Sequence, residues 1–202
     1  MPSKLIGLGR RLSWNDFKEA EPPADAPHAA AGVYLQHKVA GATPNKLFPD
    51  AARPMYYLPD TITIQVVLTE ATFRAPIVAK MKADEKASLL AHEQGHYDIY
   101  ALILRDYFHE LETLAGRYYD SQADLVSRLK ALKTTYLDRI AEIQKLYDTD
   151  TEHNLHSAEQ KTWLRAIRRA TKLKRQPIVR SKRGKPLERR LFDVLTEMKL
   201  LV

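Results

Sequence analysis

Residues 84–115 read DEKASLLAHEQGHYDIYALILRDYFHELETLA, and this stretch decides the fold. It contains no proline and only one internal glycine, so no residue in it forces a break in an α-helix. Gly116 follows at the position where a helix stop is expected. The stretch therefore predicts one long helix. Its larger apolar residues recur at helical spacing: Leu89, Ile99, Leu102, Ile103, Tyr107, Leu111 and Leu114.

This helix carries the pattern HExxH, as His92-Glu93-Gln94-Gly95-His96. Residues four apart differ by about 40° around a helix axis, so both imidazoles can point at one ion. Glu93 stands beside them and can reach a metal-bound water, from which it would take a proton as general base. Two surface histidines on a charged helix would give the same pattern. The β-rich segment before the helix, as in zinc peptidases, favours the metal site.

A third ligand has to come from outside the helix. Ile99 and Ile103 follow on the metal face, and Asp98 points about 160° away from it. A second helix, predicted over about 122–147, would return antiparallel. The two helices cover roughly 36 Å and 39 Å, so the end of the second lies level with the histidines. The segment at that end, residues 147–156, could instead be an ordinary polar loop. Its candidate ligands are Asp148, Asp150, Glu152, His153 and His156.

The flanking segments indicate an α+β fold. Residues 32–39 and 61–70 alternate apolar and polar side chains, which is typical of strands. Ser157 and Gln160 form a capping box for a third helix over about 158–173, and 188–201 could form a short amphipathic helix. We expect a zincin-like fold, in which a small N-terminal antiparallel sheet packs on the HExxH helix together with two or three further helices.

The charge distribution predicts one domain and an appendage. Residues 1–170 hold 22 Lys/Arg and 22 Asp/Glu, whereas residues 171–202 hold 10 and 3, which accounts for the whole net charge of +7. We therefore predict a metallopeptidase domain over 1–170 and a basic C-terminal extension over 171–202. The extension could contact nucleic acid, anionic lipid or an acidic partner, or it could simply be solvated.

Composition excludes several classes of site. The chain has no cysteine, so it has no disulfide framework, no cysteine-ligated zinc or iron–sulfur site and no cysteine nucleophile. A metal would have to be held by His, Asp and Glu. No apolar run approaches the roughly 18 residues of a membrane span, and the N-terminus lacks the apolar region of a secretory signal. The chain as given is expected to be cytoplasmic, or exported if a leader was removed.

Three motifs resemble one bacterial family. LSWNDF (12–17), LLAHEQGHYDI (89–99) and YDTDTEHNLHSAEQKTW (147–163) are similar to the signatures of the zinc-dependent protease family called domain of unknown function 922. The resemblance covers about residues 12–165. It implies Zn²⁺ as cofactor, His92 and His96 as ligands, Glu93 as catalytic base and His153 as third ligand. Glu152 is the second choice for that position, and Asp148 or Thr151 could instead orient an imidazole from behind.

The leading hypothesis is zinc-dependent hydrolysis of a peptide or protein substrate. An edge strand, 61–70, would align the substrate by strand addition, and Tyr147, Tyr97 or His156 could stabilise an oxyanion. Two alternatives remain open. One is a non-catalytic, metal-stabilised module that acts through its basic tail. The other is a metal amidohydrolase that cleaves a non-peptide amide.

Overall fold

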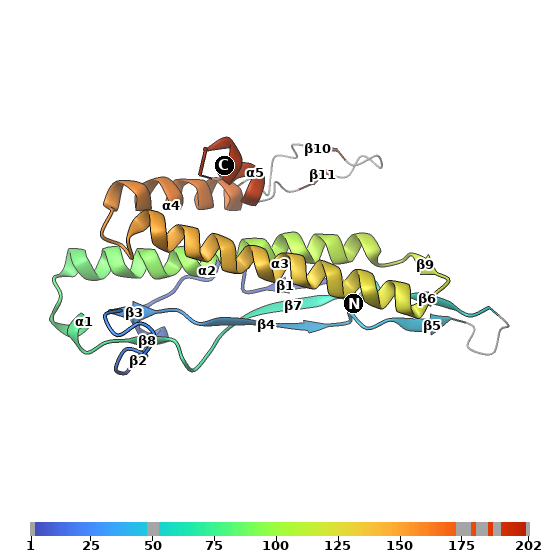
Figure 1. Cartoon of the computed structure of the whole chain (residues 1–202), viewed down its shortest axis with the longest axis horizontal. Coiled ribbons are helices and arrows are strands. Elements are labelled where there is room, and N and C mark those ends of the chain that lie inside the picture. The colour runs from blue at the N-terminus through green and yellow to red at the C-terminus, as the bar shows by residue number, and fades with distance from the viewer. Residues whose placement is uncertain (1–2, 48–52, 173–178, 181–185, 188–190, 201–202) are drawn as a thin grey trace.

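The computed structural model describes residues 3–47, 53–172, 179–180, 186–187 and 191–200, and it is organised around one long helix, α2 (Ala83–Leu114) (Figure 1). Among the described residues, three further helices follow α2, namely α3 (Gln122–Thr151), α4 (Ser157–Lys172) and α5 (Leu191–Glu197). A short helix, α1 (Ile77–Lys80), precedes it, and Trp14–Asp16 form one 3₁₀ turn. The α+β fold class predicted from the sequence is confirmed.

The strands are short and lie mostly before α2. They are β1 (Lys4–Ile6), β2 (Lys18–Glu19), β3 (Ala31–Gly32), β4 (Leu35–Ala40), β5 (Asn45–Leu47), β6 (Met55–Tyr57), β7 (Thr63–Leu68), β8 (Phe73–Arg74), β9 (Tyr118–Tyr119), β10 (Val179–Arg180) and β11 (Pro186–Leu187). Within the described residues they form sheets of order β1-β7-β4, β2-β8-β3, β5-β6-β9 and β10-β11.

Two expectations about the sheet are corrected. The sheet was predicted to be antiparallel, but β7 pairs parallel with β1 and antiparallel with β4, so the sheet is mixed. Residues 61–70 were predicted to form an edge strand. The strand found there, β7, is central because its backbone is paired on both sides. The edges of this sheet are β1 and β4, and alternation of side chains along a strand does not reveal which strands flank it.

The core surrounds α2. Every residue of 99–108 is buried, because β7 packs on one side of α2 while α3, α4 and α5 pack on others. This stretch is apolar except for Arg105 and Asp106, which are buried and pair with each other at 3.2 Å. Figure 1 shows strands β2 to β8 on one side of α2 and α4 on the opposite side. The site residues His92 to His96 therefore lie directly before the most buried part of α2.

Helix α3 returns antiparallel beside α2, as its length predicted (Figure 1). Ser121 caps its start, with its Oγ accepting a hydrogen bond from the backbone N–H of Asp124 at 3.2 Å. The helix continues to Thr151, one turn beyond its predicted end near residue 147. Its final turn lies beside the HExxH segment, and this extra turn decides which residues face the two histidines.

Helix α5 attaches the C-terminal region to the core. In α5, Val194 and Leu195 are fully buried in the core, and Glu197 pairs with Arg169 of α4 at 3.2 Å. The basic residues of 173–178, 181–185 and 188–190 lie outside the described residues. The proposed boundary at residue 171 stays a prediction. Among the described helices, none has the length and apolar character that a bilayer span requires.

Candidate metal centre

Three side chains from two helices converge at one point. His92 and His96 stand one turn apart on α2, with their Nε2 atoms 3.1 Å apart. The final turns of α3 bring Asp148 to them, and its Oδ1 lies 2.9 Å from Nε2 of His96 and 3.3 Å from Nε2 of His92. One ligand atom from each residue lies within 4.8 Å of the others. These three residues could hold a metal ion.

Gln144 fixes the orientation of His96. Its Oε1 accepts a hydrogen bond from Nδ1 of the His96 ring, and its Nε2 donates to the His96 backbone carbonyl at 2.9 Å. A ring whose Nδ1 carries the proton presents a free lone pair at Nε2. The contact therefore selects the tautomer that can ligate a metal at the convergence point. Such partners behind a ligand histidine are a regular feature of metal sites.

Thr151 performs the same role for His92 through a longer contact. Its Oγ1 donates to the carbonyl of Tyr147 at 2.7 Å, which leaves an oxygen lone pair directed to Nδ1 of His92, 3.5 Å away. Both residues are buried, with Thr151 fully covered and His92 only 3% exposed. Each imidazole thus turns Nδ1 toward its supporting side chain, Gln144 or Thr151, and Nε2 toward Asp148. The sequence prediction that Thr151 or Asp148 could orient an imidazole agrees with this contact for Thr151.

Electrostatics couple the carboxylate to the two rings. Burial alone would raise the pKa of Asp148, but hydrogen bonds from His92 and His96 outweigh it and hold that pKa far below its usual value. Burial alone would lower the pKa of His96, whereas the hydrogen bond to Asp148 raises it overall. A pocket that stabilises negative charge on one oxygen next to two imidazoles suits a cation. Two nitrogens and one oxygen are also a donor set that zinc accepts.

Tyr147 packs directly on the histidines. Its ring stacks on His92 with centroids 4.8 Å apart and an interplanar angle of 16°, and it meets His96 edge-on at 4.9 Å. Gly95 makes this possible, because a Cβ at position 95 would lie 2.3 Å from the Tyr147 hydroxyl oxygen. Gly95 therefore allows α3 to approach α2 closely at this point.

The two tyrosines considered for an oxyanion role have other partners. The hydroxyl of Tyr147 donates to the carbonyl of His92 at 3.3 Å, and that of Tyr97 donates to the carbonyl of Gly7 at 2.8 Å. Both side chains are fully buried. Both hydroxyls therefore make hydrogen bonds inside the protein, and the bond from Tyr97 links the N-terminal segment to α2. Gln94 adds to this attachment, because its Oε1 accepts from the backbone N–H of Leu12 at 2.8 Å.

Glu93 is buried next to the metal-binding group. Only 4% of its surface is exposed, and its Oε2 accepts a hydrogen bond from the backbone N–H of Val33 at 2.9 Å. Burial raises the pKa of this carboxyl above its usual range, while the nearby His96 and His92 act in the opposite direction. The segment between β3 and β4 thus positions Glu93, which the sequence did not predict.

His153, the third ligand implied by the resemblance, lies beside this group. Its side chain is 80% exposed, and its Nδ1 lies 3.4 Å from Oδ1 of Asp148. It follows the end of α3 in a left-handed segment, where Glu152, His153 and Asn154 have φ values of 42°, 51° and 85°. The group that converges contains Asp148 in the place where His153 was predicted. A ligand role for His153 stays a prediction.

The segment after α3 and the start of α4 are hydrogen-bonded to Ser88 of α2. Asn154 accepts a hydrogen bond from Ser88 through Oδ1 at 2.7 Å, and Gln160 donates to the carbonyl of Ser88 at 3.1 Å. His156, one of the candidate ligands, instead pairs with Glu152 at 3.3 Å. Trp163 links α4 to the end of α3, since its Nε1 donates to Oδ2 of Asp150 at 2.8 Å.

Sequence reasoning missed Gln144. A usable signal existed, because Gln144, Tyr147, Asp148 and Thr151 recur at spacings of three and four and therefore share one helix face. The helix was predicted to end near residue 147, so Asp148 and Thr151 fell outside it and this face was incomplete. No protein-family model, no curated protein and no solved structure matches this chain. The assignment of the site therefore rests on its geometry.

Proposed function

We propose that the chain is a zinc-dependent hydrolase of peptide bonds, with zinc held by His92, His96 and Asp148. The observation that carries this proposal is the convergence of two imidazole nitrogens and one carboxylate oxygen beside Glu93, with both rings oriented from behind. Catalytic zinc sites commonly combine three protein ligands of this kind with one open position. In this proposal, Asp148 takes the third position that the motif resemblance gives to His153.

Zinc would supply a Lewis acid that polarises a carbonyl and lowers the pKa of a coordinated water toward about 7. The chain would supply the proton transfers. Glu93 would accept a proton from the attacking water and return it to the amine that leaves. Its hydrogen bond with Val33 keeps the carboxylate in one place, and its buried position excludes bulk water. Gln144 and Thr151 would accept a hydrogen bond from Nδ1 of each histidine, which leaves Nε2 as the atom that can ligate zinc.

The test is a comparison of Glu93→Gln with Glu142→Gln, a matched change at an exposed position of α3. Each protein is loaded with zinc and incubated with a mixed peptide library, and new termini are counted by mass spectrometry. We expect Glu93→Gln to keep its zinc and to lose hydrolysis by on the order of 10²–10⁴-fold. Normal turnover by this variant would exclude Glu93 as the base. Absence of hydrolysis by the zinc-loaded wild type would contradict the proposed function.

A further inference from the structure

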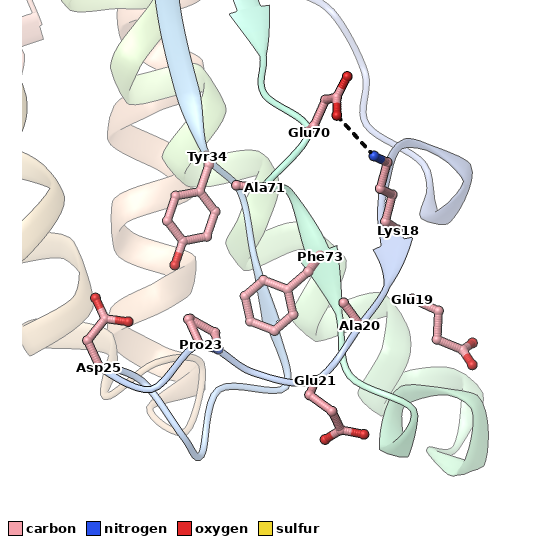
Figure 2. A pocket seen from close by; sticks show the side chains of 10 residues that line it. All are labelled: Lys18, Glu19, Ala20, Glu21, Pro23, Asp25, Tyr34, Glu70, Ala71 and Phe73. Atoms are coloured by element: carbon pink, nitrogen blue, oxygen red, sulfur yellow. Dashed lines mark hydrogen bonds and ion pairs between the residues drawn. The ribbon is translucent and has the colours of Figure 1, made fainter.

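A groove of about 360 Å³ lies in the N-terminal part of the molecule, around β2 and β8 (Figure 2). Its floor includes two aromatic rings, Tyr34 and Phe73, whose centroids are 6.3 Å apart. Tyr34 leaves 39% of its surface exposed, which is high for a large aromatic residue. An apolar floor open to solvent can cover the aliphatic part of an incoming side chain.

The groove includes the residue that follows the backbone partner of Glu93. The backbone N–H of Val33 donates to Glu93 at 2.9 Å, and the next residue, Tyr34, contributes its side chain to the groove. The backbone of Tyr34 is itself fixed, because its N–H donates to Oγ1 of Thr72 at 3.1 Å. The groove residue Tyr34 is therefore adjacent in sequence to the residue that holds Glu93.

The charge of the groove is negative. Lys18 is paired with Glu70 at 3.5 Å, as the dashed line in Figure 2 marks. Glu21 and Asp25 are exposed, and among the described residues neither has an ion-pair partner. Figure 2 shows the Tyr34 hydroxyl on the side of the groove where Asp25 lies. Burial, and then the negative charges of Asp25 and Glu93, raise the pKa of the Tyr34 phenol.

We propose that this groove binds a lysine or arginine side chain of the peptide substrate. The aliphatic stem would lie on Tyr34 and Phe73, and the terminal charge would meet Glu21 and Asp25. The rings can add a cation–π attraction. This inference rests on the proposed function for its substrate class, but the groove can be tested without turnover. Because the carboxylates are exposed, each ion pair contributes modestly, and we expect selectivity of about tenfold in Kd.

The experiment uses the full chain carrying Glu93→Gln, loaded with zinc, so that bound peptides are not cleaved. The probes are blocked alanine hexapeptides with lysine, arginine, norleucine or glutamate at one central position. Binding is measured by NMR titration of the ¹⁵N-labelled protein. We expect lysine and arginine peptides to bind about tenfold more tightly than the norleucine peptide, with amide shifts centred on Tyr34 and Phe73.

Two double variants decide the origin of the selectivity. Glu21→Gln with Asp25→Asn should bring the lysine and norleucine peptides to equal Kd. The control, Asp120→Asn with Asp138→Asn, removes the same charge from exposed positions outside the groove and should change nothing. Equal binding of all peptides, no binding at all, or selectivity that survives the first double variant would overturn the proposal. Selective binding without hydrolysis by the wild type would support the groove while removing the proposed function.

Discussion

Asp148 Oδ1 lies 2.9 Å from Nε2 of His96, although one residue is on α2 and the other is near the end of α3. This contact turns a pair of histidines on one helix into a group of three donors. It depends on the antiparallel return of α3 and on its extension to Thr151. Side-chain direction changes by about 100° per residue along an α-helix. Asp148 therefore faces α2 only because the helix continues through it. The candidate metal centre is therefore a property of the helix pair.

Gln144 should tune metal affinity without touching the metal. Gln144→Leu removes the acceptor for Nδ1 of His96, so the ring loses its fixed tautomer, and we expect zinc affinity to fall about 10–100-fold. Thr151→Val should have a smaller effect, because the contact with His92 is 3.5 Å long. Competition titration with a chromophoric chelator gives the affinities.

The control for this prediction is Gln122→Leu, at an exposed position in the first turn of α3. The ¹⁵N shifts of the His96 ring provide a second readout. In the zinc-loaded wild type they should show Nδ1 protonated and Nε2 unprotonated, and Gln144→Leu should not keep this single pattern. Unchanged ring shifts together with unchanged zinc affinity would show that Gln144 has no positioning role.

Gly95 should tolerate no side chain while Tyr147 is present. Alanine is the better helix former by about 1 kcal/mol, but its Cβ would lie 2.6 Å from Cζ of Tyr147 as well as 2.3 Å from its hydroxyl oxygen. We expect Gly95→Ala to lower the free energy of unfolding by about 1–3 kcal/mol. In a Tyr147→Leu background the same change should instead be stabilising. Urea unfolding of the four proteins measures this reversal of sign, and the same loss in both backgrounds would refute the packing role of Gly95.

Asp150 should stabilise the end of α3 through Trp163. The indole is fully buried, and its N–H donates to Oδ2 of Asp150. Asp150→Ala leaves this donor unsatisfied and should reduce the free energy of unfolding by about 1–3 kcal/mol. Asp150→Asn keeps an acceptor and should remain close to the wild type. Thermal and urea denaturation without metal compare the two variants, and equal stability of both would show that the hydrogen bond contributes nothing.

The helices were predictable because their signals are local. The absence of proline from 84–115 and the cap at Ser121 fix where α2 and α3 run. Helix α4 begins at Ser157, one residue before its predicted start, and Gln160 hydrogen-bonds to Ser88. The sheet was less predictable, because its order depends on pairing between distant segments. The central position of β7 required β1, only three residues long, to pair with it in parallel.

The sequence predicted which segment meets His92 and His96, but it did not predict which residue of that segment faces them. Helix lengths brought the segment 147–156 to His92 and His96, as the structure confirms for Asp148. The choice among neighbours depends on helix rotation and on the exact end of α3. Since α3 continues to Thr151, Asp148 stays on the face toward α2, and His153 falls in the left-handed segment beyond it. No composition or spacing rule resolves two residues this close.

The most direct test of the metal centre is a zinc titration of the wild type, Asp148→Ala and His153→Ala, each stripped of metal beforehand. We predict one zinc per chain in the wild type. Loss of the Asp148 carboxylate should weaken binding by at least about 100-fold, because it removes a ligand rather than a supporting residue. Loss of His153 should leave the affinity within about threefold, as for an exposed side chain outside the group. A wild type that refuses zinc, or a strong loss in His153→Ala with none in Asp148→Ala, would contradict the assignment.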